Sequence, residues 1–164
     1  MKDLGPLRYF LSLEISQGPQ GILLSQQKYL LDILDRAELT DDGTVDTPLQ
    51  QNIKFRSTDG EPLSDPTQYR HFVGQLVYLC ISRLDISHAV GIVSQFVSAS
   101  RSIHYATLLR ILRYLRGTNT RSLLFPAISK LELCAYSDAD WAGDPTIRKS
   151  TTGYCIFLGD FLIS

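Results

Sequence analysis

Two aspartates, Asp138 and Asp140, are the residues of this sequence best suited to metal chemistry. They follow an apolar run at residues 131–136 that is typical of a strand, so Asp138 is expected at the end of that strand. Side chains alternate between the faces of a strand, which places both carboxylates on one side if the strand continues. Carboxylate oxygens are ligands that Mg²⁺ and Mn²⁺ prefer. The pair predicts a metal site, although aspartates beside a turn such as residues 141–145 are also ordinary turn formers.

Three arginines form a second chemical feature. Arg110, Arg113 and Arg116 lie on one side of an expected helix, opposite a stripe of leucine and isoleucine side chains. Residues 101–130 hold six basic residues and no acidic one, which sets this segment apart from its acidic flanks. Guanidinium groups at this spacing could bind the phosphates of a nucleic acid. The competing interpretation is a solvated helix face with no ligand.

Other familiar kinds of active site are not indicated. The three histidines have no paired spacing, and the three cysteines form no Cys-x-x-Cys motif, so neither a zinc site nor a disulfide framework is predicted. The sequence has no Gly-x-Ser-x-Gly elbow, no Walker loop and no Gly-x-Gly-x-x-Gly turn. These absences leave the aspartate pair and the arginine face as the candidates.

The composition limits the kind of protein in which these residues can lie. The chain has 164 residues, is 44% hydrophobic and 20% charged, and has a net charge of −1. This is typical of a folded domain with one core or two small ones. No apolar run reaches the ~18 residues of a membrane span, and the first residues lack the features of a secretory signal. An intracellular protein without a membrane partner is therefore expected.

The hydrophobic pattern predicts an α+β fold. Residues 9–15 and 22–24, separated by a Gly-Pro-Gln-Gly turn, predict a β-hairpin, and a helix follows from Ser25 to about Leu39. The polar segment 40–64 is long for a loop and marks a candidate boundary. Three helical segments and then four strands are expected further along, at about residues 65–80, 86–96, 103–116, 122–125, 131–136, 153–158 and 161–163.

Several motifs, in one order along the whole chain, resemble the Pol polyprotein of copia-type LTR retrotransposons. The most specific is the pair of segments Tyr-Ser-Asp-Ala-Asp-Trp-Ala-Gly-Asp at residues 136–144 and Arg-Lys-Ser-Thr-Thr-Gly-Tyr-Cys at residues 148–155. The others lie at residues 3–11, 25–29, 46–48, 69–79, 94–96 and 111–118. One such segment is a weak signal, whereas this many in one order is specific.

The resemblance implies a division into three parts. Residues 1–64 are similar to the primer-grip hairpin, helix and loop of reverse transcriptase, and residues 65–120 to its helical thumb or connection. Residues 121–164 resemble the first strands of an RNase H-like mixed sheet. The expected polymerase motif Tyr-x-Asp-Asp would lie before Met1, and the remaining RNase H carboxylates after Ser164, so a truncated segment is expected.

The resemblance also implies roles for single residues. Arg8, Tyr9 and Phe10 are expected to contact nucleic acid at the primer grip. Asp138 matches the first catalytic carboxylate of RNase H, which with Mg²⁺ or Mn²⁺ cleaves the RNA strand of a hybrid in the intact enzyme. Expected partners are an RNA/DNA or DNA template–primer duplex and the remainder of the Pol polyprotein.

Two positions depart from the family pattern. Ser12 stands where the hairpin usually has Gly, and Leu84 where Pro is usual in Arg-Pro-Asp; both bring the local backbone geometry into question. With only one RNase H carboxylate matched, a non-catalytic segment of the polyprotein is expected. Three alternatives stay open: a stand-alone nucleic-acid-binding module using the arginine helix, an inert remnant, and a metal-dependent transferase using Asp138 and Asp140 as an Asp-x-Asp site.

Overall fold

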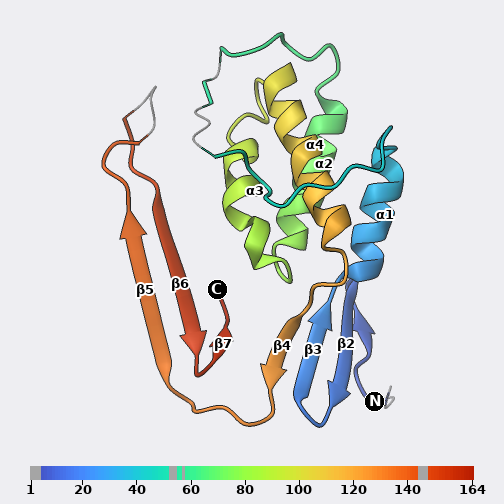
Figure 1. Cartoon of the computed structure of the whole chain (residues 1–164), viewed down its shortest axis with the longest axis vertical. Helices are drawn as coiled ribbons and strands as arrows, with labels where there is room; N and C mark the ends of the chain where they lie inside the picture. The colour runs from blue at the N-terminus through green and yellow to red at the C-terminus, as the bar shows by residue number, and fades with distance from the viewer. Residues whose placement is uncertain (1–4, 52–54, 57, 144–147) are drawn as a thin grey trace.

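A helical layer and two antiparallel sheets make up the fold (Figure 1). The computed structural model describes residues 5–51, 55–56, 58–143 and 148–164. The helices are α1 (Gln27–Ala37), α2 (Thr67–Leu79), the 3-10 turn η1 (Leu84–Ile86), α3 (Ser87–Ser94) and α4 (Ser102–Gly117). The strands are β1 (Tyr9–Phe10), β2 (Leu13–Gly18), β3 (Gly21–Ser25), β4 (Leu123–Pro126), β5 (Leu133–Ala139), β6 (Thr152–Leu158) and β7 (Phe161–Leu162). The predicted α+β class is confirmed.

The first sheet has the strand order β1-β2-β3-β4 and is antiparallel throughout. The predicted hairpin is confirmed as β2 and β3, which turn between Gly18 and Gly21. Gly21 has a φ of 139°, and a Cβ there would collide with the carbonyl oxygen of Phe125 in β4. The close approach of β4 therefore depends on glycine at this position. Residues 122–125 were expected with the later strands, but they pair with β3 instead.

The single first strand expected at residues 9–15 is wrong, because the backbone reverses at Leu11 and Ser12. These residues have φ values of 47° and 62°, in the left-handed region that favours glycine. The reversal lets β1 fold back and pair with β2, with Tyr9 opposite Glu14 and Phe10 opposite Leu13. The hydroxyl of Tyr78 in α2 donates a hydrogen bond to the carbonyl of Leu11 and holds this turn against the helices. The departure of Ser12 from glycine thus coincides with an unfavourable backbone conformation.

Replacing Ser12 with glycine is expected to stabilise the protein. Glycine adopts the observed φ without the steric cost that serine carries, so the free energy of unfolding should rise by about 0.5–1 kcal/mol. Urea denaturation followed by circular dichroism measures the change. Ser16→Gly is the matched control, because Ser16 lies within β2 and glycine there should destabilise the strand by a similar amount. A loss of stability in both variants would contradict the expectation.

The hydrophobic core lies among the helices. The apolar residues of α2 and α4 recur at helical spacing and are buried where the two helices face each other and α1 and α3. Leu76, Leu79, Ile111, Leu112 and Leu115 are fully buried, as is Ile33 of α1. The helices expected near residues 65–80, 86–96 and 103–116 are confirmed as α2, α3 and α4, and α4 ends at Gly117 as expected.

His104 fixes the beginning of α4. Its Nδ1 accepts a hydrogen bond of 3.1 Å from the backbone N–H of Arg101, and its ring stacks on Phe96 with 3.8 Å between the centroids. The side chain is fully buried, and burial lowers the pKa of His104 below its usual value because the protonated ring would lose water. A neutral, structural histidine at this position agrees with its lack of a histidine partner in the sequence.

The second sheet, β5-β6-β7, stands beside the helices and is largely exposed (Figure 1). A mixed sheet was expected, but all of its described strands pair in the antiparallel sense. Its contact with the first sheet is through Phe161 of β7, which packs on Phe125 of β4 with 3.8 Å between the ring centroids. No helix in the described part of the chain is long and apolar enough to cross a bilayer.

Candidate nucleic-acid interface and carboxylate pair

The short strand β1 presents two exposed aromatic rings. Tyr9 and Phe10 are 54% and 57% exposed because β1 is the edge of the first sheet and successive side chains point to opposite faces. The ammonium group of Lys28, at the start of α1, lies 6.0 Å from the centroid of the Tyr9 ring. Arg8 precedes the pair and is also exposed. Exposed rings beside cations are suited to stacking against nucleic-acid bases.

The arginine face of α4 is assembled as predicted, but its guanidinium groups have partners within the chain. Arg113 binds the carboxylate of Asp41 with both Nε and Nη2, at 3.3 and 2.7 Å. Arg116 donates to the carbonyl oxygens of Asp41, at 2.6 Å, and of Gly43, and Arg110 donates to the hydroxyl of Thr47 at 3.1 Å. The expected open face is therefore covered by the loop that follows α1.

The acid that neutralises this face comes from a distant part of the sequence. Asp41 is the partner of both Arg113 and Arg116, although residues 101–130 contain no acidic residue. The hydrogen bonds from Arg113, together with the backbone N–H of Gly43, lower the pKa of Asp41 to about 2. Asp41 is consequently ionised at neutral pH. Local sequence carried no signal for this pairing, since several acids in the same loop were equally plausible partners.

Asp138 and Asp140 line one cavity, in agreement with the prediction that they face the same way. Asp138 lies in β5 opposite Gly153 of β6, and the cavity has a volume of about 590 Å³. Its opposite wall includes Ser87 and His88 at the start of α3. The second sheet and α3 therefore bring the two carboxylates beside a histidine that lies about 50 residues earlier in the chain.

The carboxylate of Asp140 is already used by the backbone around it. Its Oδ1 accepts hydrogen bonds from the N–H groups of Thr151 and Gly143, at 2.9 and 3.2 Å. Asp138 accepts one from the neighbouring Ala139 at 2.9 Å. Asp140 thus acts as a turn former, which was the competing interpretation. The third acidic residue of the motif, Asp144, lies outside the described residues.

The described residues do not fit a site for two divalent ions. Among them no group of three or more His, Cys, Asp or Glu side chains could hold a metal ion. A two-ion site for phosphodiester cleavage needs several carboxylates that bridge and flank both ions. Two carboxylates, Asp138 and Asp140, that both already accept backbone hydrogen bonds fall short of that set.

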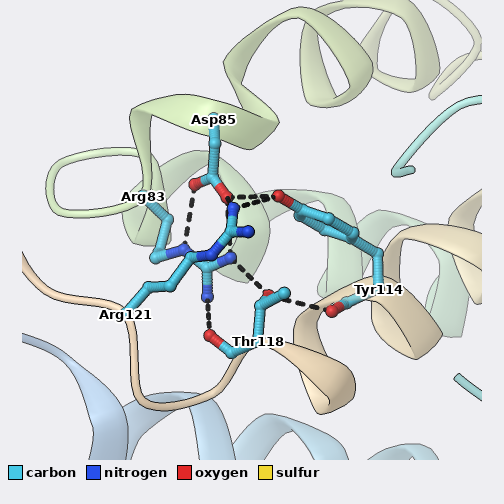
Figure 2. A network of polar contacts seen from close by, with 5 residues as sticks. All are labelled: Arg83, Asp85, Tyr114, Thr118 and Arg121. Carbon is cyan, nitrogen blue, oxygen red and sulfur yellow. Dashed lines mark hydrogen bonds and ion pairs between the residues drawn. The ribbon is translucent and has the colours of Figure 1, made fainter. Parts of the chain in front are cut away.

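A polar network that the sequence analysis missed connects η1 to the end of α4 (Figure 2). Arg83 binds Asp85 with Nε and Nη2, at 2.9 and 2.8 Å, and donates to the carbonyl and the hydroxyl of Thr118, at 2.9 and 2.6 Å. Tyr114 donates to Asp85 at 2.7 Å, and Arg121 contacts both Tyr114 and Asp85. The sequence does carry a signal for this network, because Arg83 and Asp85 are opposite charges two residues apart in a segment rich in apolar residues.

Arg83, at the centre of the network, is shielded from water, and this determines the electrostatics of its ion pair. The side chain of Arg83 is 4% exposed and that of Asp85 is 30% exposed. Burial alone would raise the pKa of Asp85, but hydrogen bonds from Arg83 and Tyr114 outweigh burial and lower it. Asp85 is therefore ionised at neutral pH, and its contacts with Arg83 and Tyr114 connect η1 to α4.

Comparison with known proteins finds close relatives over the whole chain. The retrovirus-related Pol polyprotein from transposon RE1 of Arabidopsis thaliana is 44% identical over all 164 residues, and that from transposon TNT 1-94 of Nicotiana tabacum is 38% identical over 173 aligned positions. The chain spans 11% and 13% of the length of these two relatives.

A shorter relative covers the same region. The uncharacterized mitochondrial protein AtMg00810 of Arabidopsis thaliana is 43% identical over the whole chain, which spans 68% of its length. No family model matches the chain. No solved structure matches it either.

Proposed function

Since this chain belongs to the retrovirus-related Pol polyproteins of copia-type transposons, we propose that it is the segment running from late reverse transcriptase into RNase H. The parent polyprotein would synthesise DNA on an RNA template and degrade the RNA of the resulting hybrid. Residues 1–64 would supply the primer-grip hairpin and residues 65–120 the thumb or connection. Within residues 121–164, β5, β6 and β7 would supply the first RNase H strands, while β4 completes the sheet of the hairpin. The order of the motifs along the chain supports this assignment.

The segment's own contribution, in this proposal, is to hold the template–primer duplex. The observation that carries it is the exposed aromatic pair of β1, Tyr9 and Phe10, with Arg8 before it and Lys28 over the Tyr9 ring. Exposure of an aromatic ring to water is unfavourable, and stacking on a base lowers the free energy of the ring. The neighbouring cations attract phosphates. The turn at Leu11 and Ser12, anchored by Tyr78, keeps these rings at the sheet edge.

The segment is proposed not to cleave nucleic acid by itself. Asp138 would be the first RNase H carboxylate of the parent enzyme, with Mg²⁺ or Mn²⁺ supplying the Lewis acid there. Asp140 would orient the loop beside it through the backbone N–H groups of Thr151 and Gly143. The remaining ligands of a two-ion site would come from other parts of the polyprotein.

Replacing both Tyr9 and Phe10 with alanine is expected to weaken binding to an RNA/DNA hybrid about thirtyfold. Loss of base stacking at ~1–3 kcal/mol per ring accounts for an effect of at least this size. Fluorescence anisotropy with a labelled hybrid, and in parallel with a DNA duplex, measures the affinity over a range of salt concentrations. The dependence on salt should stay the same, since neither side chain carries charge.

The control removes exposed apolar surface that is not aromatic. Ile128 and Leu131, 94% and 90% exposed between the two sheets, should be replaceable by alanine without change in affinity. Failure of the unaltered protein to bind either duplex at low salt would overturn the proposed role. Cleavage of the RNA strand that disappears in Asp138→Asn would overturn the non-catalytic part of the proposal.

A further inference from the structure

The loop that covers the arginine face, residues 41–47, is here named the strap. It leaves the end of α1 and crosses α4, where Arg110, Arg113 and Arg116 each donate at least one hydrogen bond to it (Figure 1). Val45 within the strap packs against the helical core. The strap is thus held at two kinds of contact, one ionic and one apolar.

The ionic contact has the geometry of phosphate recognition. Arg113 grips the two carboxylate oxygens of Asp41 with Nε and Nη2, and Arg116 reaches Oδ1 of the same group at 3.3 Å. This two-nitrogen fork binds carboxylate and phosphate oxygens alike. Asp41 therefore occupies the position that a phosphate of a bound nucleic acid would take.

The strap satisfies the arginines only in part. The Nε groups of Arg110 and Arg116 are buried and have no acceptor among the described residues. A buried donor without a partner costs free energy, so the covered arrangement is a compromise. The ion pairs themselves are partly exposed, with Asp41 at 47% and Arg113 at 29% side-chain exposure. Ion pairs of this exposure contribute little net stability.

We propose that the strap is an internal competitor for a phosphate-binding surface, made by Arg110, Arg113 and Arg116, whose partner is a nucleic-acid backbone. Asp41 leaves the arginines when a phosphate arrives, and the strap stays attached through Val45. A duplex brings several phosphates and releases counterions, which one carboxylate cannot match. The inference rests on the proposed role in holding a template–primer duplex. It adds the arginine face as a second surface that contacts the duplex, and the strap as the segment that regulates this contact.

Asp41→Asn tests the competition directly. The amide loses the charge that Arg113 and Arg116 hold, so the affinity for an RNA/DNA hybrid is expected to rise about fivefold. The slope of the logarithm of the affinity against the logarithm of salt concentration should steepen by about one to two, since one or two further phosphates are neutralised. Anisotropy titrations over a range of salt concentrations give both quantities. Circular dichroism establishes that the variant is folded.

Asp42→Asn is the matched control, because it changes the net charge equally at the neighbouring exposed position. It should leave both the affinity and the salt slope near those of the unaltered protein. Adding Arg113→Gln to Asp41→Asn should abolish the gain. Hydrogen exchange of residues 41–47 should also become faster when the unaltered protein is saturated with hybrid.

The outcomes separate the two proposals. If binding depends on Tyr9 and Phe10 but Asp41→Asn behaves as Asp42→Asn does, the strap inference is overturned and the duplex-holding role stands. Unchanged or slower exchange of residues 41–47 in the complex would overturn the inference as well. If neither the unaltered protein nor Asp41→Asn binds nucleic acid at low salt, both proposals fall.

Discussion

Asp85→Asn is expected to lower the free energy of unfolding by about 2–4 kcal/mol, since it leaves the guanidinium of Arg83 buried without its counterion. The amide can keep one hydrogen bond, but it cannot compensate a charge that is 4% exposed. The variant should also loosen η1 from the end of α4, because Tyr114 loses the charged acceptor of its hydroxyl. Urea denaturation at pH 7 measures the loss.

The ion pair of Arg83 and Asp85 also predicts how the free energy of unfolding changes with pH. The pKa of Asp85 is lowered in the folded protein from its ordinary value of 3.8, so the folded state favours the ionised carboxylate. Its stabilising contribution is therefore complete above the unfolded value and is lost as the pH falls through the lower folded value. In Asp85→Asn this part of the acid sensitivity should be absent.

Two variants distinguish a buried charge pair from simple loss of contacts. Arg121→Gln removes a guanidinium of the same network that is 57% exposed, and it should cost less than about 1 kcal/mol. Replacing Arg83 with Met and Asp85 with Leu together should cost less than Asp85→Asn alone, because no buried unpaired charge remains; Arg121 loses its partner but is 57% exposed. A double variant that is less stable than Asp85→Asn would contradict this explanation.

Leu112→Ala is expected to cost about 3 kcal/mol. Leu112 is fully buried in the core between the helices, so the change removes apolar contacts and leaves a cavity that rigid helices fill incompletely. Tyr136→Ala on the second sheet is the control; its side chain is 67% exposed, and the cost should stay near 0.5 kcal/mol. Equal losses from the two changes would show that the second sheet shares the core, against the burial observed.

This contrast matters for the proposed function. The helical core carries the stability, and β1, the strap and the arginine face are attached to it. Asp138 belongs instead to a sheet whose described contact with the first sheet is the stacking of Phe161 on Phe125. The surfaces proposed to bind nucleic acid are therefore attached to the stable helical core. The carboxylate pair lies on the second sheet, which has fewer contacts with the rest of the fold.

The helices and the family were predictable from sequence because their signals are local. Apolar side chains at helical spacing determined α2 and α4, and Gly117 marked the end of α4. Position 12, where the family usually has glycine, lies in a turn in which Leu11 and Ser12 are both left-handed. Family membership followed from the order of the motifs and was confirmed by relatives 38–44% identical to the chain.

The features that could not be predicted from the sequence are contacts between residues far apart in the chain. The pairing of β4 with β3 and the contact of Asp41 with Arg113 each join segments far apart in the chain. Neither leaves a periodic pattern, so the arginine helix was expected to be open. The aspartate pair was placed correctly because strand alternation is a local rule, and the two carboxylates do line one cavity. Their metal-binding role, like the nucleic-acid contacts of Arg8, Tyr9 and Phe10, stays a prediction.

The partnership of β4 with β3 has a consequence for how the protein acquires its structure. Leu23 and Leu124 face each other across strands that are separated by about a hundred residues, so a large loop must close before this sheet is complete. Contacts of such long range slow folding, whereas the local contacts of α4 can form early. During synthesis on the ribosome, the edge of β3 that pairs with β4 would remain unpaired until all four helices had been made, because β4 follows α4 in the chain.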